Sequence, residues 1–160
     1  MNNLIEYVEK LVQTTTSTKG HLFPKGMTVN GFGQAKKVTK PWGFELWLSD
    51  ASDTPYALKI IYVKKGTKTS LQLHNEKSEH NCVLSGTISL HYQNPKTESI
   101  DQVTLGPGHV IKILPETIHR IEALTDVVLV EASSNQLYDV VRLKDDYRRP
   151  SGKIDSEHSK

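Results

Sequence analysis

Residues 66–86 read GTKTSLQLHNEKSEHNCVLSG, and this stretch decides how the rest of the chain is interpreted. In an extended segment that ends at His74, side chains two residues apart share a face, so Gln72 points the same way as His74. The turn-forming residues 75–78 are enough to bring Glu79 back beside them on the next strand. An amide oxygen, an imidazole and a carboxylate around one point suit a divalent metal with open coordination positions.

A further histidine lies far downstream of this stretch. His119 follows the turn-forming residues 115–117 and begins another segment of β type. We expect it to reach the same cavity from the opposite side of a barrel. His80 comes directly after Glu79, so alternation along the strand predicts that its side chain faces outward.

Short β-type segments separated by turn residues continue on both sides of this stretch, without helical interludes. This pattern predicts an all-β antiparallel sandwich or barrel. The expected strands are Glu45–Leu48, Tyr56–Val63, Thr69–His74, Asn81–His91, Val110–Leu114, His119–Ala123 and Val127–Ala132. Nearer the N-terminus, apolar residues at helical spacing over residues 4–12 predict one short amphipathic helix.

Composition limits the remaining possibilities. The 160 residues fit one domain, with an N-terminal helix and connector (1–35), a barrel (36–147) and a flexible tail (148–160). The 20 basic and 18 acidic residues give a net charge of +2, so we expect no nucleic-acid or membrane partner. The single Cys82 excludes an internal disulfide, and no signal peptide or apolar run of membrane-spanning length is present. A cytoplasmic protein is expected.

Two spacings in the chain resemble the two sequence motifs of the cupin superfamily. The first is Gly66-x5-Gln72-x-His74-x4-Glu79-x6-Gly86, in which Gln72 stands where the motif usually has a histidine. The second begins at Gly108 and keeps His119, while Leu114, Glu116 and Ala123 replace the usual Pro, Gly and Asn. The resemblance implies a cupin double-stranded β-helix, which is a jelly-roll barrel.

Within the cupins, the chain is similar to the C-terminal mannose-6-phosphate isomerase (type II) domain of bifunctional isomerase and guanylyltransferase enzymes. Five stretches carry this resemblance in the same order: residues 40–43, 59–63, 70–80, 119–122 and 139–147. It implies a metal bound by Gln72, His74, Glu79 and His119. We expect zinc, with manganese, nickel and iron as alternatives, and the resemblance also implies a homodimer. The chain departs from the family at residues 75–78 and at Asn81.

Three residues are candidates for catalysis. Glu76 extends the face of Gln72 and His74, so it is either a proton shuttle at the cavity mouth or an exposed turn carboxylate. Lys59 is the second candidate for the base. Lys59 and Arg120 match family positions and are also candidates for holding a phosphate, with surface ion pairing as the alternative. Alternation turns Arg120 outward if His119 points inward.

These observations lead to one function and two alternatives. We expect a metal-dependent isomerase that exchanges the aldose and ketose forms of a sugar or sugar phosphate. The first alternative is a non-catalytic cupin that binds a sugar or nucleotide sugar. The second is an iron-dependent cupin oxygenase. Gln72 disfavours it, because an amide ligand in place of a histidine makes the site harder and richer in oxygen, which favours zinc, manganese or magnesium-like ions over redox iron.

Overall fold

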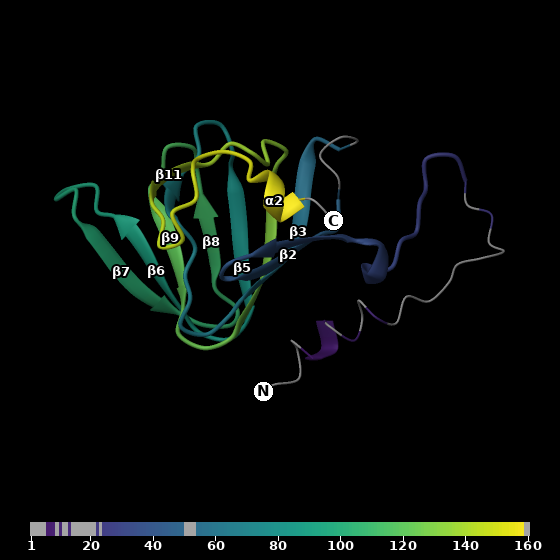
Figure 1. Cartoon of the computed structure of the whole chain (residues 1–160), viewed down its shortest axis with the longest axis horizontal. Helices are drawn as coiled ribbons and strands as arrows, with labels where there is room; N and C mark the ends of the chain where they lie inside the picture. The colour runs from purple at the N-terminus through teal and green to yellow at the C-terminus, as the bar shows by residue number, and fades with distance from the viewer. Residues whose placement is uncertain are drawn as a thin grey trace.

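The chain folds into two antiparallel sheets that face each other (Figure 1). The computed structural model describes residues 6–8, 10, 13, 22, 24–49 and 54–158. The first sheet has six strands in the order β1 (Lys36–Lys40), β2 (Gly43–Trp47), β3 (Tyr56–Val63), β10 (Val127–Ser134), β5 (Glu79–Ser85) and β8 (Val110–Ile113). The second has five strands in the order β11 (Val141–Lys144), β4 (Leu71–Leu73), β9 (His119–Ala123), β6 (Ile88–Gln93) and β7 (Ile100–Leu105).

The two sheets confirm the expected all-β class, and the predicted strands 56–63 and 119–123 have the observed bounds. The expected single strand 81–91 is wrong, because it is divided between β5 and β6. The division lies at Gly86, whose φ of +85° ends one strand and turns the chain into the other sheet. Strands β1, β7 and β11 were not expected, because exposed polar residues obscure their alternation.

Gly86 provides a test of this turn. A Cβ atom at this position would lie 2.1 Å from the carbonyl oxygen of Asp126, in addition to the cost of a positive φ. We expect Gly86→Ala to lower the free energy of unfolding by about 2 kcal/mol. Gly66→Ala is the control, since Gly66 also has a positive φ of +75° but no atom within 4 Å of the added carbon. Urea unfolding of both variants measures the difference, and equal losses would contradict the expected clash.

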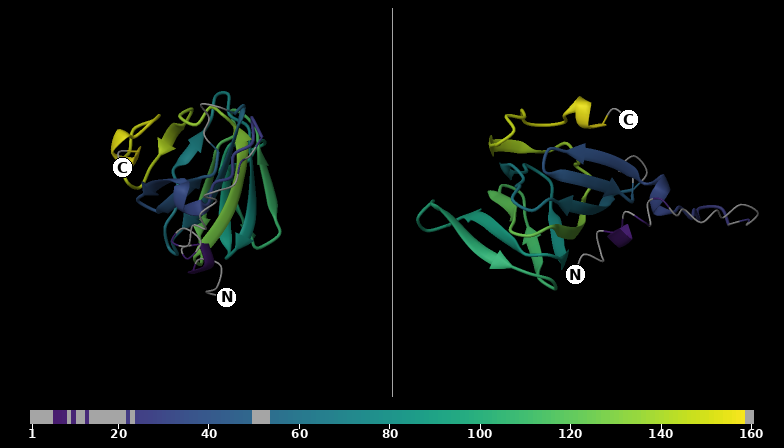
Figure 2. Two further views of the ribbon diagram at one scale, coloured as in Figure 1. Left: turned by 90° about the vertical axis from the view of Figure 1, so that its right-hand side faces the viewer. Right: turned by 60° about the horizontal axis from the view of Figure 1, so that its bottom comes forward.

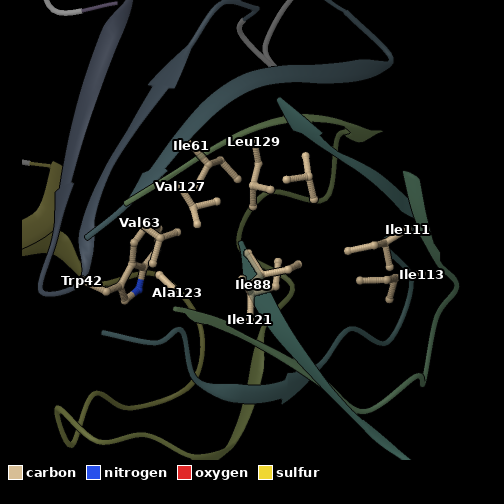
Figure 3. Close-up of a cluster of buried hydrophobic side chains, with 11 residues drawn as sticks. Trp42, Ile61, Val63, Ile88, Ile111, Ile113, Ile121, Ala123, Val127 and Leu129 are labelled. Atoms are coloured by element: carbon tan, nitrogen blue, oxygen red, sulfur yellow. The ribbon is translucent and has the colours of Figure 1, made fainter. Parts of the chain in front are cut away.

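The interior of the barrel changes from apolar to polar along its strands. On the inward face of β3, Val63 and Ile61 are followed by Lys59, and on β10 Val127 and Leu129 are paired with them in register. The apolar half forms the main core, in which side chains of both sheets meet (Figure 3). The polar half of the same faces is therefore built by the ordinary two-residue alternation, with no change in the backbone.

A second apolar cluster lies on the outer face of the first sheet. Phe44, Ile60 and Val128 pack there with Val8, which is 6% exposed. Of the helix expected over residues 4–12, residues 6–8 and 10 are helical, and the other expected positions lie outside the described residues. The buried Val8 accounts for part of the apolar spacing in this segment. No helix among the described residues is long and apolar enough to cross a membrane.

The segment expected to be a flexible tail makes side-chain contacts with the barrel. A short helix, α2 (Asp155–His158), lies beside β1 and β2, as the two views in Figure 2 illustrate. Glu157 forms an ion pair with Lys40 of β1 at 2.7 Å, and the ring of His158 lies 5.3 Å from that of Trp47 on β2. The chain after β11 therefore returns to the first sheet.

Candidate metal centre

Four predicted ligands lie at the polar end of the barrel, contributed by both sheets. His119, at the start of β9, pairs directly with Gln72 of β4 within the second sheet. His74 follows the end of β4, whereas Glu79 begins β5 in the first sheet. The expected positions of Glu79 and His119 were therefore wrong: His119 is the in-sheet neighbour of Gln72, and Glu79 faces them from the other sheet. The turn after His74 carries the chain across the barrel.

His74, Glu79 and His119 form a compact group of ligand atoms. One such atom from each residue lies within 4.8 Å of the others. The Nε2 atom of His119 is 3.4 Å from Oε1 of Glu79, and Nε2 of His74 is 3.8 Å from Oε2. All three residues are at most 4% exposed. Two imidazoles and one carboxylate at this spacing match the donor set that zinc and manganese accept.

Both imidazole rings are oriented by backbone carbonyl groups. Nδ1 of His119 donates to the carbonyl oxygen of Thr117 at 2.9 Å, and Nδ1 of His74 donates to that of Asp139. These bonds place the proton on Nδ1 and leave the lone pair of Nε2 directed into the cluster. This arrangement is the usual one for histidines that bind a metal, so the residues fit a divalent ion.

Asp139 also shapes the turn that carries the chain between the sheets. Its carboxylate accepts hydrogen bonds from the backbone N–H groups of Asn75, Glu76 and Lys77 at 3.0, 2.6 and 3.0 Å. Burial by itself raises the pKa of this carboxyl, but the N–H donors outweigh it and lower the pKa. Asp139 begins one of the stretches that carry the family resemblance, and this contact gives that position a physical role.

Gln72 lies beside the cluster with its amide nitrogen, not its oxygen, nearest to it. Oε1 of Gln72 accepts a hydrogen bond from the hydroxyl of Ser70 at 2.6 Å, and Nε2 lies 3.5 Å from Nε2 of His74. A half-turn of the amide would exchange the two atoms and bring the oxygen toward His74. Gln72 is thus placed next to the three other predicted ligands.

Lys77 is a central residue of the site that the sequence analysis missed. It is 5% exposed, and its ammonium group contacts the carboxylates of Glu79 and, at 2.9 Å, Glu131. The ammonium group of Lys59 lies between two further carboxylates, 3.3 Å from that of Glu131 and 3.5 Å from that of Glu45. Part of this network has a sequence signal, because Glu131 shares the inward face of Val127 and Leu129. Lys77 has none, since it lies in the turn.

Two of the three candidate catalytic residues are not brought to the cluster. Glu76 is exposed and lies outside the pocket lining, because its turn is pinned by Asp139 and does not continue the strand. Arg120 is buried, but its guanidinium group bonds the carbonyl oxygens of Thr69 and Lys144 and the carboxylate of Asp146. Lys59 does line the pocket. Glu76 thus matches the second of its two expected roles, an exposed turn carboxylate, and the outward direction expected for Arg120 agrees with its contacts.

The charges around the cluster shift the pKa values of its residues toward the protonation states that bind a metal cation. Burial raises the pKa of Glu79, but Lys77 and the two histidines outweigh it, so that pKa lies well below its usual value. Burial and the neighbouring Lys77 lower the pKa of His74. Burial would lower the pKa of Lys77, yet Glu131 and Glu79 raise it above its usual value. An ionised carboxylate and a neutral imidazole are the forms that bind metals.

Glu45 makes the stability of this network depend on pH. Burial raises the pKa of its carboxyl, but Lys59, Lys40 and a hydrogen bond from Trp47 lower it to about 2. In the unfolded chain the same group titrates near 4.5, so on acidification the unfolded state takes up the proton first. We therefore expect the free energy of unfolding to be constant for this group above about pH 5 and to fall toward about pH 2.

Urea unfolding at several pH values across this window measures the effect, with Glu45→Gln as the comparison. The variant lacks the titrating group, so the slope of its unfolding free energy against pH should be smaller than that of the wild type. Identical slopes would contradict the assignment. Because other carboxylates also titrate in this range, the difference between the two proteins is the quantity to compare.

The cluster lies in a pocket at the polar end of the barrel, with a volume of about 100 Å³. Six basic side chains line it: Lys40, Lys59, Lys77, Arg142, Arg149 and Lys153. The acidic side chains of the lining are Glu45, Glu79, Glu131 and Glu157. Basic groups therefore exceed acidic groups along the described lining, even though one wall carries a carboxylate-containing ligand set.

Two facing antiparallel sheets with a His, His and Glu cluster inside one end define a cupin. The chain belongs to the mannose-6-phosphate isomerase C-terminal family, whose sequence model matches residues 29–145. This assignment confirms the resemblance drawn from the motifs.

Individual relatives support the fold. The chain is 29% identical over 120 residues to the mannose-1-phosphate guanylyltransferase RfbM of Salmonella typhimurium, covering 72% of this chain and 23% of that protein. It thus spans about a quarter of the length of this curated relative. Oxalate decarboxylase of Bacillus subtilis, described with Mn(II) centres, has a TM-score of 0.61 at 15% identity, covering 77% of this chain and 35% of that one.

A second solved structure is that of the capsular polysaccharide assembling protein CapF from Staphylococcus aureus. It has a TM-score of 0.59 at 17% identity and covers 90% of this chain and 38% of that one. At such identities, the likeness to both structures concerns the fold alone.

Proposed function

We propose that the chain is a metal-dependent isomerase that exchanges the aldose and ketose forms of a sugar phosphate, with mannose 6-phosphate as the first substrate to test. The observation that carries this proposal is the buried His74, Glu79 and His119 cluster, placed in a pocket rich in basic groups. Membership of the mannose-6-phosphate isomerase C-terminal family supports the choice of substrate class. Gln72 is the proposed fourth ligand.

A divalent ion at this cluster would supply Lewis-acid polarisation of the sugar oxygens; we propose zinc, with manganese, nickel and iron as alternatives. The exchange also moves a proton between neighbouring carbon atoms, which requires a base. Glu131 is the proposed base, since its buried carboxylate is linked to Glu79 through Lys77. Lys59 and Lys77 are proposed to donate hydrogen bonds to substrate oxygens, so Lys59 takes a donor role in place of the expected role as base.

The experiment is to load the purified protein with each metal in turn and follow interconversion of mannose 6-phosphate and fructose 6-phosphate. We expect turnover that disappears with a chelator and returns with metal. In Glu131→Gln, turnover should fall at least about a hundredfold while metal content stays unchanged, as expected for a base that is not a ligand. Absence of turnover with every aldose or ketose phosphate would contradict the proposal.

The two alternative functions give different results in the same assays. A cupin that only binds a sugar or nucleotide sugar would show saturable binding without conversion, and the binding would survive Glu131→Gln. An oxygenase would consume oxygen when loaded with ferrous iron. Either result would replace the isomerase proposal.

A further inference from the structure

The segment that follows β11 places a carboxylate inside the pocket. Glu157 of α2 lies between two cations: its Oε2 is 2.7 Å from Nζ of Lys40, and its Oε1 is 3.1 Å from Nη1 of Arg149. All three side chains are 9% exposed. Both oxygens of one anionic group are therefore held by basic side chains that are already withdrawn from water. Pairs of charge-assisted contacts of this kind commonly bind carboxylate and phosphate groups in proteins.

Two nitrogen atoms at the same end of the pocket lack hydrogen-bond partners; that of Arg142 is a donor, and that of His158 is one when it carries the ring proton. The Nε atom of Arg142 and the Nδ1 atom of His158 are buried without a hydrogen-bond partner among the described residues. Burial and the nearby Arg149 lower the pKa of Arg142, and burial, Lys40 and Lys36 lower that of His158. Carboxylates oppose both shifts: Glu45 and Glu157 act on both groups, and Asp145, which pairs with Arg149 at 2.8 Å, also acts on Arg142. Both oxygens of Glu157 contact Lys40 and Arg149, so the nitrogen atoms of Arg142 and His158 are left without a partner.

The same pocket connects this end to the metal cluster. From Lys40 the ion pairs continue to Glu45 at 3.7 Å and on through Lys59, Glu131 and Lys77 to Glu79. A molecule that contacts the cluster with one end can thus direct an anionic group toward Lys40 and Arg149 within one lining. Exchanging one anion for another there adds no desolvation cost for the two cations, which are already buried.

The segment that carries Glu157, from the end of β11 through α2, has few contacts that would keep it from moving. Between β11 and α2 the backbone adopts positive φ at Arg148 (+58°) and Gly152 (+79°), and α2 contributes no side chain to either apolar cluster. Segments with few buried apolar contacts open locally at low cost. The two ion pairs of Glu157 and the ring contacts of His158 with Trp47 and Tyr138 hold this helix against the barrel. A competing anion therefore acts directly on one of the two kinds of contact that keep Glu157 in place.

We propose that Lys40 and Arg149 form a subsite for a phosphate monoester, and that Glu157 occupies this subsite in the free protein and leaves when the phosphate binds. This inference rests on the proposed function, since it assigns the end of the pocket that receives the phosphoryl group of a sugar phosphate. A phosphate dianion has three terminal oxygens and two charges, so it also satisfies the donors of Arg142 and His158 that the carboxylate leaves unpaired.

The test is calorimetric titration of the full chain with inorganic phosphate, mannose 6-phosphate and mannose. Glu157→Gln removes the internal competitor, so both phosphates should bind about tenfold more tightly, whereas Lys40→Met and Arg149→Met should weaken them at least about tenfold. The matched control is Asp155→Asn, which removes the same charge from the same helix at a side chain that is 88% exposed. It should leave the phosphate affinity unchanged. Binding of mannose should not respond to Glu157→Gln.

The outcomes separate this inference from the proposed function. If Glu157→Gln binds phosphate no more tightly than Asp155→Asn does, the subsite is contradicted, even when the wild type isomerises its substrate. If it binds phosphate more tightly but no sugar phosphate is converted, the subsite stands and the isomerase proposal fails. The gain in Glu157→Gln cannot come from misfolding, because a partly unfolded protein binds less. The comparison of Glu157→Gln with Asp155→Asn therefore tests the phosphate subsite even if Lys40→Met or Arg149→Met does not fold.

Discussion

Glu79→Gln is expected to reduce bound divalent metal from about one ion per chain to background, and to lower any metal-dependent turnover at least about a hundredfold. Glu79 is the sole carboxylate of the three-residue cluster found among the described residues, and it faces both histidines across the barrel. The amide of glutamine keeps the size of the side chain but removes its negative charge. Elemental analysis after dialysis, followed by a competition titration with a chromogenic chelator, measures the loss.

The matched control is His80→Ala on the same strand. His80 is the next residue of β5, and its side chain is exposed, pointing away from the cluster. This variant should retain its metal, although it removes a potential ligand from the immediate neighbourhood. Full metal content in Glu79→Gln, or loss of metal in His80→Ala, would show that the ion binds elsewhere.

Lys77→Met is expected to lower the free energy of unfolding of the metal-free protein by about 4 kcal/mol, because it leaves two buried carboxylates without their shared cation. These carboxylates belong to Glu79 and Glu131, each 4 to 5% exposed. Methionine preserves the length and apolar stem of lysine, so loss of packing contributes little. Urea unfolding in the presence of a chelator measures the change.

Two further variants serve as comparisons for the loss of stability expected in Lys77→Met. Lys153→Met removes a lysine whose side chain is 44% exposed, so it should lower the free energy of unfolding far less than Lys77→Met does. The double variant Lys77→Met with Glu131→Gln should be more stable than the sum of the single losses predicts, because only one buried carboxylate, that of Glu79, then loses the ammonium group of Lys77. Additive losses, or a loss below about 1 kcal/mol in Lys77→Met, would contradict a structural role for this ion pair network.

The sequence was sufficient for the parts of the site that depend on local periodicity. The alternation that places Gln72 and His74 together lies within one strand, and motif spacing adds Glu79 and His119. It did not determine which sheet each residue joins, because pairing partners are set by contacts between distant segments. For that reason Glu79 was expected beside Gln72 and was found opposite it.

The turn between the sheets accounts for the other errors. Extending the strand past His74 pointed Glu76 inward and left Lys77 without a role, whereas the observed turn exposes Glu76 and buries Lys77. Its course is set by Asp139, which is 63 residues away from Glu76 in the sequence. No pattern within the turn itself carries that information. The boundary at Gly86, by contrast, could have been read from the sequence, since glycine inside a strand pattern often marks a break.

The dependence of this turn on Asp139 has a consequence for the order in which the molecule is made. His74 receives its ring orientation from a carbonyl group 65 residues downstream, so the ligand turn is shaped only after the chain beyond β10 has been synthesised and docked. Chains emerge from the ribosome N-terminal end first, and contacts between distant residues form slowly. We therefore expect the metal-binding geometry to form only after the segment that contains Asp139 has docked, so the time course of metal uptake during refolding should follow that docking.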